Sequence, residues 1–264
     1  MKRILLRVAY DGTNYHGYQI QSGCATIEGE LNRAVSELTG EVNIELIGGS
    51  RTDSGVHALD NVCVFDTDAS IPADKYIFAL NQRLPEDIRI TSSEEVAPDF
   101  HPRHCDSVKT YEYRIHTGAV PNPLKRLYSY HTFYNLDIKL MNEACKFIIG
   151  EHDFSAFCAA GAQVDSKIRT VYSCEIIASD DIGEKESSEY SDSCCNLDKD
   201  IVIRVSGNGF LYNMVRIIAG TLIEVGRGHI APTEVEGIIA SCDRTQAGPT
   251  APACGLSLQK YLLL

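Results

Sequence analysis

Residues 48–58 read GGSRTDSGVHA and join two apolar runs, at 44–47 and 56–65, that predict neighbouring strands. Glycines in such a connection allow positive φ angles and let another part of the chain approach closely. Asp53 lies in the middle of it, two residues after Arg51, whose charge favours the ionised carboxylate. An ionised carboxylate held in one orientation can act as a nucleophile or as a base. The alternative is a hairpin loop in which Asp53 bonds only to its own backbone.

The segments around this loop predict an N-terminal α+β half. Residues 2–10 form a predicted strand, followed by a helix that begins after Thr26, a typical N-cap, and ends at Gly40. Beyond the loop, a second helix begins near Pro72, and a last strand occupies residues 87–96. This βαββαβ order is typical of the ferredoxin-like, RNA-binding kind of α+β sandwich.

A second α+β half is predicted after residues 97–106, which contain two prolines and show no periodicity. Predicted strands lie at 109–115, 128–134, 169–178, 201–206 and beyond residue 255, and predicted helices at 137–149, 211–225 and 232–241. Residues 150–157 are predicted to be a loop. We therefore expect two domains, 1–103 and 104–264, of ferredoxin-like or RRM-like build, with mixed or antiparallel sheets facing a central cleft.

Three further features carry candidate functional side chains, and each has a structural alternative. The turn-rich residues 11–21 contain Tyr15 and Tyr18, which suit stacking on bases; the structural alternative is that they are half-buried loop anchors. Tyr111 lies on an alternating strand and either faces a cleft or fills the core. Arg216 lies within an apolar helix, where it either reaches the surface or meets a carboxylate.

Composition and charge limit the class of protein. The formal net charge is −12, and half of it comes from residues 180–200, which contain eight Asp or Glu and two Lys. This stretch predicts a surface loop, and an acidic total does not exclude a local basic face that binds nucleic acid. No Cys or His spacing fits a metal site, and the ten cysteines form no C-x-x-C pair. Without a signal peptide or a membrane-length apolar run, the sequence predicts a cytoplasmic protein with no membrane partner.

With these segments collected, the chain resembles the tRNA pseudouridine synthase A family. The specific signature is RTDSGVHA at 51–58, and shorter matches follow in the same order along the whole chain. These matches include YDG at 10–12, GYQ at 17–19, FHPR at 100–103, KTYEY at 109–113, DFSAF at 153–157, GNGF at 207–210, MVR at 214–216 and APACGL at 251–256.

The resemblance implies an isomerase that converts uridine to pseudouridine at positions 38, 39 and 40 of the tRNA anticodon stem-loop, with no cofactor and no metal. Asp53 would be the nucleophile, Tyr111 would lie against the uracil ring, and Arg216 would pair with Asp53. Arg51 would contact the RNA backbone. Further substrate contacts are implied for Thr52, His57, Tyr18, Gln19, Asn208 and Leu256. A homodimer in which one tRNA spans both subunits is also expected.

Two features depart from the family pattern, and two other functions stay open. Tyr18 stands where a Trp is expected, in a chain that contains no Trp, and the acidic stretch is longer than usual. One alternative is a non-catalytic RNA-binding protein in which Asp53 is structural. The other is a hydrolase that uses Asp53 together with His57, although four residues of separation do not by themselves bring the two side chains together.

Overall fold

The structure is a computed structural model that describes residues 1–42, 44–161, 164–178 and 199–264. Its contacts divide the chain into two compact units. Unit 1 comprises Met1–Val108 together with Ser257–Leu264, and unit 2 comprises Lys109–Leu256. The C-terminal residues therefore belong with the N-terminal part of the chain. The domain boundary expected between residues 103 and 104 stays a prediction.

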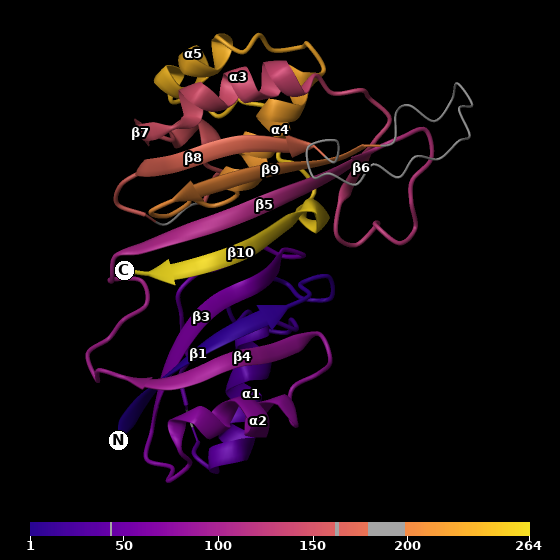
Figure 1. Cartoon of the computed structure of the whole chain (residues 1–264). Helices are drawn as coiled ribbons and strands as arrows, with labels where there is room; N and C mark the ends of the chain where they lie inside the picture. Colours follow the sequence, from indigo (N-terminus) through magenta and orange to yellow (C-terminus); the bar gives the residue numbers. More distant parts are fainter. Residues whose placement is uncertain (43, 162–163, 179–198) are drawn as a thin grey trace. The chain divides into compact units, whose positions relative to one another are not determined.

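Unit 1 is an α+β sandwich (Figure 1). Its elements, in chain order, are β1 (Lys2–Tyr10), α1 (Ile27–Thr39), β2 (Ile47–Gly48), β3 (His57–Thr67), α2 (Tyr76–Asn81), β4 (Ile88–Val96) and β10 (Leu256–Leu263). The strands β4, β1 and β3 are neighbours in that order and antiparallel. The short β2 pairs with β3 in antiparallel orientation, and β10 pairs with β3 in parallel. The predicted βαββαβ order is confirmed.

Local signals in the sequence set the ends of α1. The Thr26 side-chain oxygen accepts a hydrogen bond from the Gly29 amide at 3.3 Å, which caps the first turn. At the other end, Gly40 takes the left-handed conformation with φ of 73°. The face of the helix between these caps is apolar, and its buried side chains are Ile27, Leu31, Ala34 and Val35.

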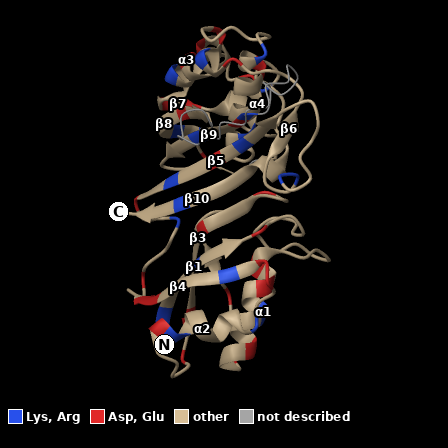
Figure 2. Cartoon of the chain, turned by 45° about the vertical axis from the view of Figure 1, so that its right-hand side comes forward, with Lys and Arg blue, Asp and Glu red and all other residues tan. Residues whose placement is uncertain are grey.

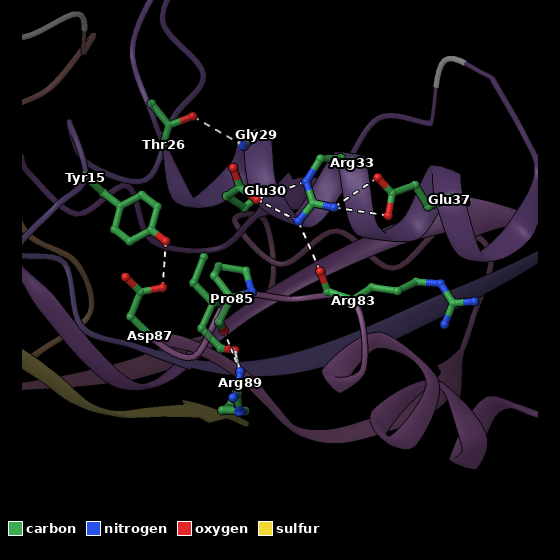
Figure 3. A network of polar contacts seen from close by, with 11 residues as sticks. Tyr15, Thr26, Gly29, Glu30, Arg33, Glu37, Arg83, Pro85, Asp87 and Arg89 are labelled. Atoms are coloured by element: carbon green, nitrogen blue, oxygen red, sulfur yellow. Dashed lines mark hydrogen bonds and ion pairs between the residues drawn. The ribbon is translucent and has the colours of Figure 1, made fainter.

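The outer face of α1 is charged and is tied to the turn after α2. Arg33 forms ion pairs with Glu30 at 2.8 Å and with Glu37 at 3.0 Å, and it also donates to the Arg83 carbonyl at 3.1 Å (Figure 3). Acidic side chains, including that of Glu28, gather along this helix (Figure 2). The Arg33 charge is therefore neutralised within the unit.

Unit 2 is a second α+β layer structure. Its elements are β5 (Ser107–Thr117), β6 (Tyr130–Thr132), α3 (Ile138–Ile148), β7 (Gly150–Asp153), β8 (Ile168–Ala178), β9 (Lys199–Gly207), α4 (Met214–Gly226) and α5 (Glu234–Ser241). The sheet order is β5-β9-β8-β7, all antiparallel, and β6 runs parallel to β5. Helix α3 packs against α4, α5 and β8 on one face of this sheet (Figure 1).

Three predicted segments differ from the structure because backbone groups find other partners. The strand predicted at 44–47 is reduced to β2, because the Leu46 amide donates to the Asn32 side chain of α1 at 3.1 Å instead of to β3. The segment predicted as a loop at 150–157 begins with the strand β7, paired with β8. The strand predicted at 128–134 shortens to β6, preceded by hydrogen-bonded turns.

The helix predicted to begin at Leu211 begins at Met214 instead. Asn213, the residue before it, takes the left-handed conformation with φ of 59°, which no regular helix contains. The acidic stretch predicted as a surface loop lies, from residue 179 to 198, outside the described residues. Among the described residues, no helix combines the length and the apolar character that crossing a bilayer requires.

Helix α4 is buried on most sides and packs closely on the segment that follows α5. A side-chain carbon at Gly220 would lie 1.8 Å from the carbonyl oxygen of Pro249, so only glycine allows this approach. The Thr221 hydroxyl donates within the helix and also accepts from the Gly248 amide at 2.9 Å. The segment 248–251 is thus held against one turn of α4.

We expect Gly220→Ala to lower the free energy of unfolding by about 1–3 kcal/mol, because the methyl group must push two backbones apart. Gly237→Ala, in the exposed part of α5, is the matched control, since an added carbon there meets no atom within 4 Å. The control should be neutral or stabilised by up to about 1 kcal/mol. Urea unfolding of both variants measures the difference; equal stabilities would contradict the close contact.

Candidate functional site

The Asp53 loop lies between β2 and β3 and is fixed mainly through its backbone. The amide of Tyr18 donates to the Thr52 carbonyl at 3.0 Å, and the amide of Gly55 donates to the Tyr15 carbonyl at 3.2 Å. Within the loop, the Val56 amide donates to the Asp53 carbonyl at 3.1 Å. Two irregular segments, 11–22 and 49–56, therefore hold each other.

Glycines make this contact between the two loops possible. A side-chain carbon at Gly17 would lie 2.8 Å from the Thr52 carbonyl oxygen and 3.2 Å from the backbone carbon of Asp53. At Gly12 it would lie 2.0 Å from the Val56 carbonyl oxygen. Gly17 also has a φ of 89°, which an L-residue with a side chain rarely adopts. The loop that carries the half-buried Asp53 thus packs against a segment in which residues 12 and 17 must be glycine.

A buried polar network supports the loop from below. The Thr52 hydroxyl lies 2.8 Å from the Tyr10 hydroxyl, which in turn accepts a hydrogen bond from the Asn61 side-chain amide at 3.1 Å. The same amide group donates to the Ser50 carbonyl at 2.9 Å, and its oxygen accepts from the Ser50 amide at 3.2 Å. Because Asn61 is fully buried, its bonds have no competition from water. Thr52 acts in this structure as a support for Asp53.

His57, an implied substrate contact, is buried and turned towards the residues 11–12. Its Nδ1 lies 3.1 Å from the Gly12 amide and 3.1 Å from a carboxylate oxygen of Asp11. The ring therefore contributes to joining the two loops. A direct role for His57 on a substrate stays a prediction.

Tyr18 is a core residue in this structure, and its implied contact with a substrate stays a prediction. Its side chain is 1% exposed, and a carbon added at Gly48 would lie 2.2 Å from the ring. Burial raises the pKa of the Tyr18 phenol well above its ordinary value and that of the neighbouring Cys63 thiol to about 12. Tyr15 is also buried, with its hydroxyl donating to Asp87 at 2.7 Å (Figure 3). The structural alternative, in which these tyrosines anchor the loop, describes both.

The remaining candidates of unit 1 are exposed. The side chains of Gln19 and Arg51 both reach the surface on either side of the contact between the loops. In unit 1 the structure thus brings together Arg51, Thr52, Asp53 and His57, with Gln19 at the edge of the partner loop.

In unit 2, Tyr111 projects from β5 and is almost buried, with 6% of its side chain exposed. Its ring packs edge-on against Phe210, with 5.3 Å between the ring centres. Tyr113, two residues along the same face, is fully buried and donates to the Pro252 carbonyl at 2.9 Å. Burial also raises the pKa of Tyr113. Tyr111 is therefore more accessible than Tyr113, although both belong to one aromatic layer.

The guanidinium of Arg216 is held by two fixed acceptors near the start of α4. Its Nε donates to the Ala251 carbonyl at 2.7 Å, and one terminal nitrogen donates to the Asn213 side-chain oxygen at 2.7 Å. The Ala251 amide returns a hydrogen bond to the Arg216 carbonyl at 3.1 Å. Arg216 is therefore oriented and half-buried, and its expected pairing with a carboxylate stays a prediction.

Two other candidates of unit 2 have structural contacts. Asn208 is exposed, but its side-chain oxygen accepts from the backbone amide of Thr170 at 3.0 Å. The backbone amide of Asn208 donates to the Thr170 carbonyl at 3.1 Å. Leu256 is 4% exposed, at the end of the 3-10 turn Ala253–Gly255. Their roles on a substrate stay predictions. Within the described part of the chain, no three His, Cys, Asp or Glu side chains are arranged to hold a metal ion.

Comparison with known proteins agrees with this arrangement. A family profile described as tRNA pseudouridine synthase matches residues 7–104 and 144–261, which include the Asp53 loop and the Arg216 helix. The chain belongs to the tRNA pseudouridine synthase family. It is 46% identical to tRNA pseudouridine synthase A of Ruminiclostridium cellulolyticum over 258 residues, which cover 98% of each chain. It is 44% identical to the protein of that name from Clostridium acetobutylicum over 262 residues, 99% of this chain and 100% of the relative.

The relative from Brevibacillus brevis, also named tRNA pseudouridine synthase A, is 43% identical over 258 residues, again 98% of each chain. The likeness therefore runs through both units and does not stop at one motif. The family resemblance inferred from RTDSGVHA at 51–58 is confirmed, and the protein is an enzyme of the pseudouridine synthase family.

The sequence alone did not reveal the residues that orient the Asp53 loop and Arg216. Asn61 is a fully buried amide inside the apolar strand β3, and an isolated polar residue in such a strand is a signal of a specific hydrogen-bond role. Asn213 and Ala251 fix Arg216, but neither contact is visible as a spacing in the sequence. Gly17 belongs to the GYQ match at 17–19, but the reason for a glycine there is visible only in its contact with Thr52.

We expect Gly17→Ala to reduce pseudouridine formation by about 10- to 100-fold, because the new side chain displaces the Asp53 loop. Gly23→Ala is the matched control: this glycine also has positive φ, 76°, but an added carbon meets nothing within 4 Å. Both variants carry a similar backbone strain, so a larger decrease in Tm for Gly17→Ala in thermal melts reports the added clash with the Asp53 loop. Equal turnover in the two variants would show that the loop contact does not position Asp53.

Proposed function

We propose that this enzyme isomerises uridine to pseudouridine at positions 38, 39 and 40 of the tRNA anticodon stem-loop, with Asp53 as its nucleophile and no cofactor. The observation that carries the proposal is the Asp53 loop, which bears the family's motif and is held by backbone hydrogen bonds from residues 15–18. A carboxylate positioned by rigid neighbours meets the first requirement of nucleophilic catalysis. The relatives' printed name supports tRNA as the substrate.

The reaction moves one bond and needs neither oxidation nor hydrolysis. The carboxylate of Asp53 attacks either C1′ of the ribose or the base, and the bond between C1′ and N1 breaks. The detached uracil rotates, and C5 forms the new bond to C1′. C5 then loses its hydrogen as a proton, while N1 carries a proton in the product. The atoms balance within the nucleotide and solvent, and Asp53 is regenerated.

A nucleotide within the stem must leave its stack before Asp53 reaches it. Extrusion costs roughly a few kcal/mol, and contacts with the flipped nucleotide offset that cost. We assign Tyr111 to the face of the uracil, since an aromatic ring that stacks on a base stabilises the extruded state. We assign Arg216 to Asp53 and to the position vacated by the base, and its fixed orientation supports this use of its charge.

The proposal extends to assembly and location. A homodimer with one tRNA across both subunits brings together basic surface from two chains, which suits a protein whose net charge is −12. Action on cellular tRNA supports a cytoplasmic location for the enzyme.

We expect Asp53→Asn to bind tRNA with little change and to form no pseudouridine, because the neutral amide keeps the shape of the side chain but loses the nucleophile. The measurement is tritium release from tRNA transcripts labelled at C5 of uridine, with single target uridines at position 38, 39 or 40. Asp68→Asn is the control, because the exposed Asp68 carboxylate pairs with the amino group of Met1 and lies outside the Asp53 loop. It should release tritium at the wild-type rate.

Each result of this assay separates the proposal from its competitors. Turnover by Asp53→Asn comparable with wild type would remove Asp53 as nucleophile. Wild-type protein that binds the transcripts without releasing tritium from any of them would instead support a non-catalytic RNA-binding protein. Release from some transcripts and not others would restrict the proposed positions.

We expect Tyr111→Ala to reduce turnover by far more than its effect on stability would explain. Tyr113→Ala on the same strand is the control, and it should lower the free energy of unfolding by about 3–5 kcal/mol, because it removes a fully buried ring. Urea unfolding and single-turnover rates, measured for both variants, give the comparison. Parallel losses of stability and turnover in Tyr111→Ala would make Tyr111 an ordinary core residue.

A further inference from the structure

A turn at residues 100–104 lies beside the Asp53 loop in unit 1, joined to it through one aromatic ring. The hydroxyl of Tyr261, on β10, donates to the Pro102 carbonyl at 2.5 Å. The ring of the same Tyr261 packs over Gly49, where an added carbon would lie 2.8 Å from the ring. Pro102 and Gly49 thus both lie at the hydroxyl end of one buried side chain. This places Arg103, next to Pro102, near Arg51, which follows Gly49 by two residues.

The turn itself is well defined by short-range bonds. The Phe100 amide donates to the Ala97 carbonyl at 2.9 Å, and the His104 amide donates to the His101 carbonyl at 3.0 Å. The Arg103 amide also donates to the His101 ring at 3.2 Å. The two imidazole rings stack, with 3.9 Å between their centres. Arg103 therefore extends from a hydrogen-bonded turn.

Positive charge gathers where this turn meets the Asp53 loop. The pKa of Arg103 is lowered, first by partial burial and then by the charge of Arg51, while Glu28 opposes the shift. The pKa of His101 is lowered too, first by burial and then by the charges of His104, Arg103 and Arg3. Two guanidinium groups that repel each other are unfavourable unless something negative lies between them.

Among the described residues, Glu28 acts on Arg103 from a distance, but no carboxylate forms an ion pair with either arginine. Arg33, Arg3 and Arg7 of the same unit each hold a carboxylate at 3.0 Å or closer. Across the described ranges of the chain, neither Arg51 nor Arg103 forms an ion pair or a side-chain hydrogen bond. The nearby Glu28 uses a carboxylate oxygen to accept the Ile20 amide at 2.8 Å. Arg51 and Arg103 are both exposed residues, although the guanidinium of Arg103 is partly buried.

We propose that Arg103 and Arg51 together bind one backbone phosphate of the RNA, adjacent to the nucleotide that Asp53 attacks. A phosphate fits this pair because it is anionic, and guanidinium groups bind its oxygens in a planar, directional way. Phosphate contacts fix the register of a nucleic acid on a protein. Since Arg51 is two residues from Asp53, or about 7 Å of extended chain, the bound phosphate flanks the target. Arg103 is a positioning residue, and this role rests on the proposed function.

The test is the salt dependence of tRNA affinity for Arg103→Gln. Each phosphate contact contributes slightly less than one to the slope of log affinity against log salt concentration, so the slope should fall by about 1 between roughly 50 and 200 mM salt. Near 0.1 M salt the affinity should fall roughly tenfold. Arg33→Gln is the matched control, because that arginine is on the same unit but is already paired with Glu30 and Glu37. Its slope should equal that of the wild type.

A double-mutant cycle tests whether the two arginines share a phosphate. If they do, Arg51→Gln and Arg103→Gln combined lose less affinity than the sum of the single losses. Strict additivity would overturn the shared phosphate. An unchanged slope in Arg103→Gln, or an equal decrease in Arg33→Gln, would overturn the site itself. These are binding results, and tritium release by the wild type tests the proposed isomerisation separately, so that failure of either proposal is recognised by its own measurement.

Discussion

The constraint on which the rest of unit 1 depends is the contact of two irregular loops through their backbones. Residues 12–18 lie so close to residues 52–56 that side chains at Gly12 and Gly17 would meet carbonyl groups of the other loop. Amides and carbonyls that would otherwise be buried without partners bond across this contact. The backbone that carries Asp53 is therefore held by groups that do not change charge or rotamer.

Unit 2 orients its own candidate, Arg216, by a similar physical device. Segment 248–251 approaches α4 at Gly220, and this approach places the Ala251 carbonyl where it accepts from the arginine. The left-handed Asn213 before the helix supplies the second acceptor. In both units a close glycine contact thus positions a backbone segment: the Asp53 loop in unit 1, and in unit 2 the segment with the Ala251 carbonyl that accepts from Arg216.

What the sequence predicted well was local. The caps at Thr26 and Gly40 and the alternation in β5 depend on neighbouring residues, and these elements formed as expected. What it could not predict depended on distant partners. The expected strand at 44–47 lost most of its pairing to Asn32, and Tyr18 became buried because Gly48 leaves room for its ring. The support of Thr52 by Tyr10 and Asn61 joins two strands, and no spacing in the chain encodes it.

Net charge is a poor guide to an RNA-binding surface, and this chain shows why. Its total of −12 includes arginines such as Arg33, whose charge is neutralised by the neighbouring carboxylates of Glu30 and Glu37. A phosphate backbone responds to the local potential within about one Debye length, roughly 8–10 Å in physiological salt. Within that distance, two adjacent arginines without internal partners outweigh acidic residues elsewhere on the surface. Binding of RNA therefore depends on which cationic side chains form no ion pair within the fold. Arg51 and Arg103 are two such side chains among the described residues, and they lie beside the loop of Asp53, where the target nucleotide must be positioned.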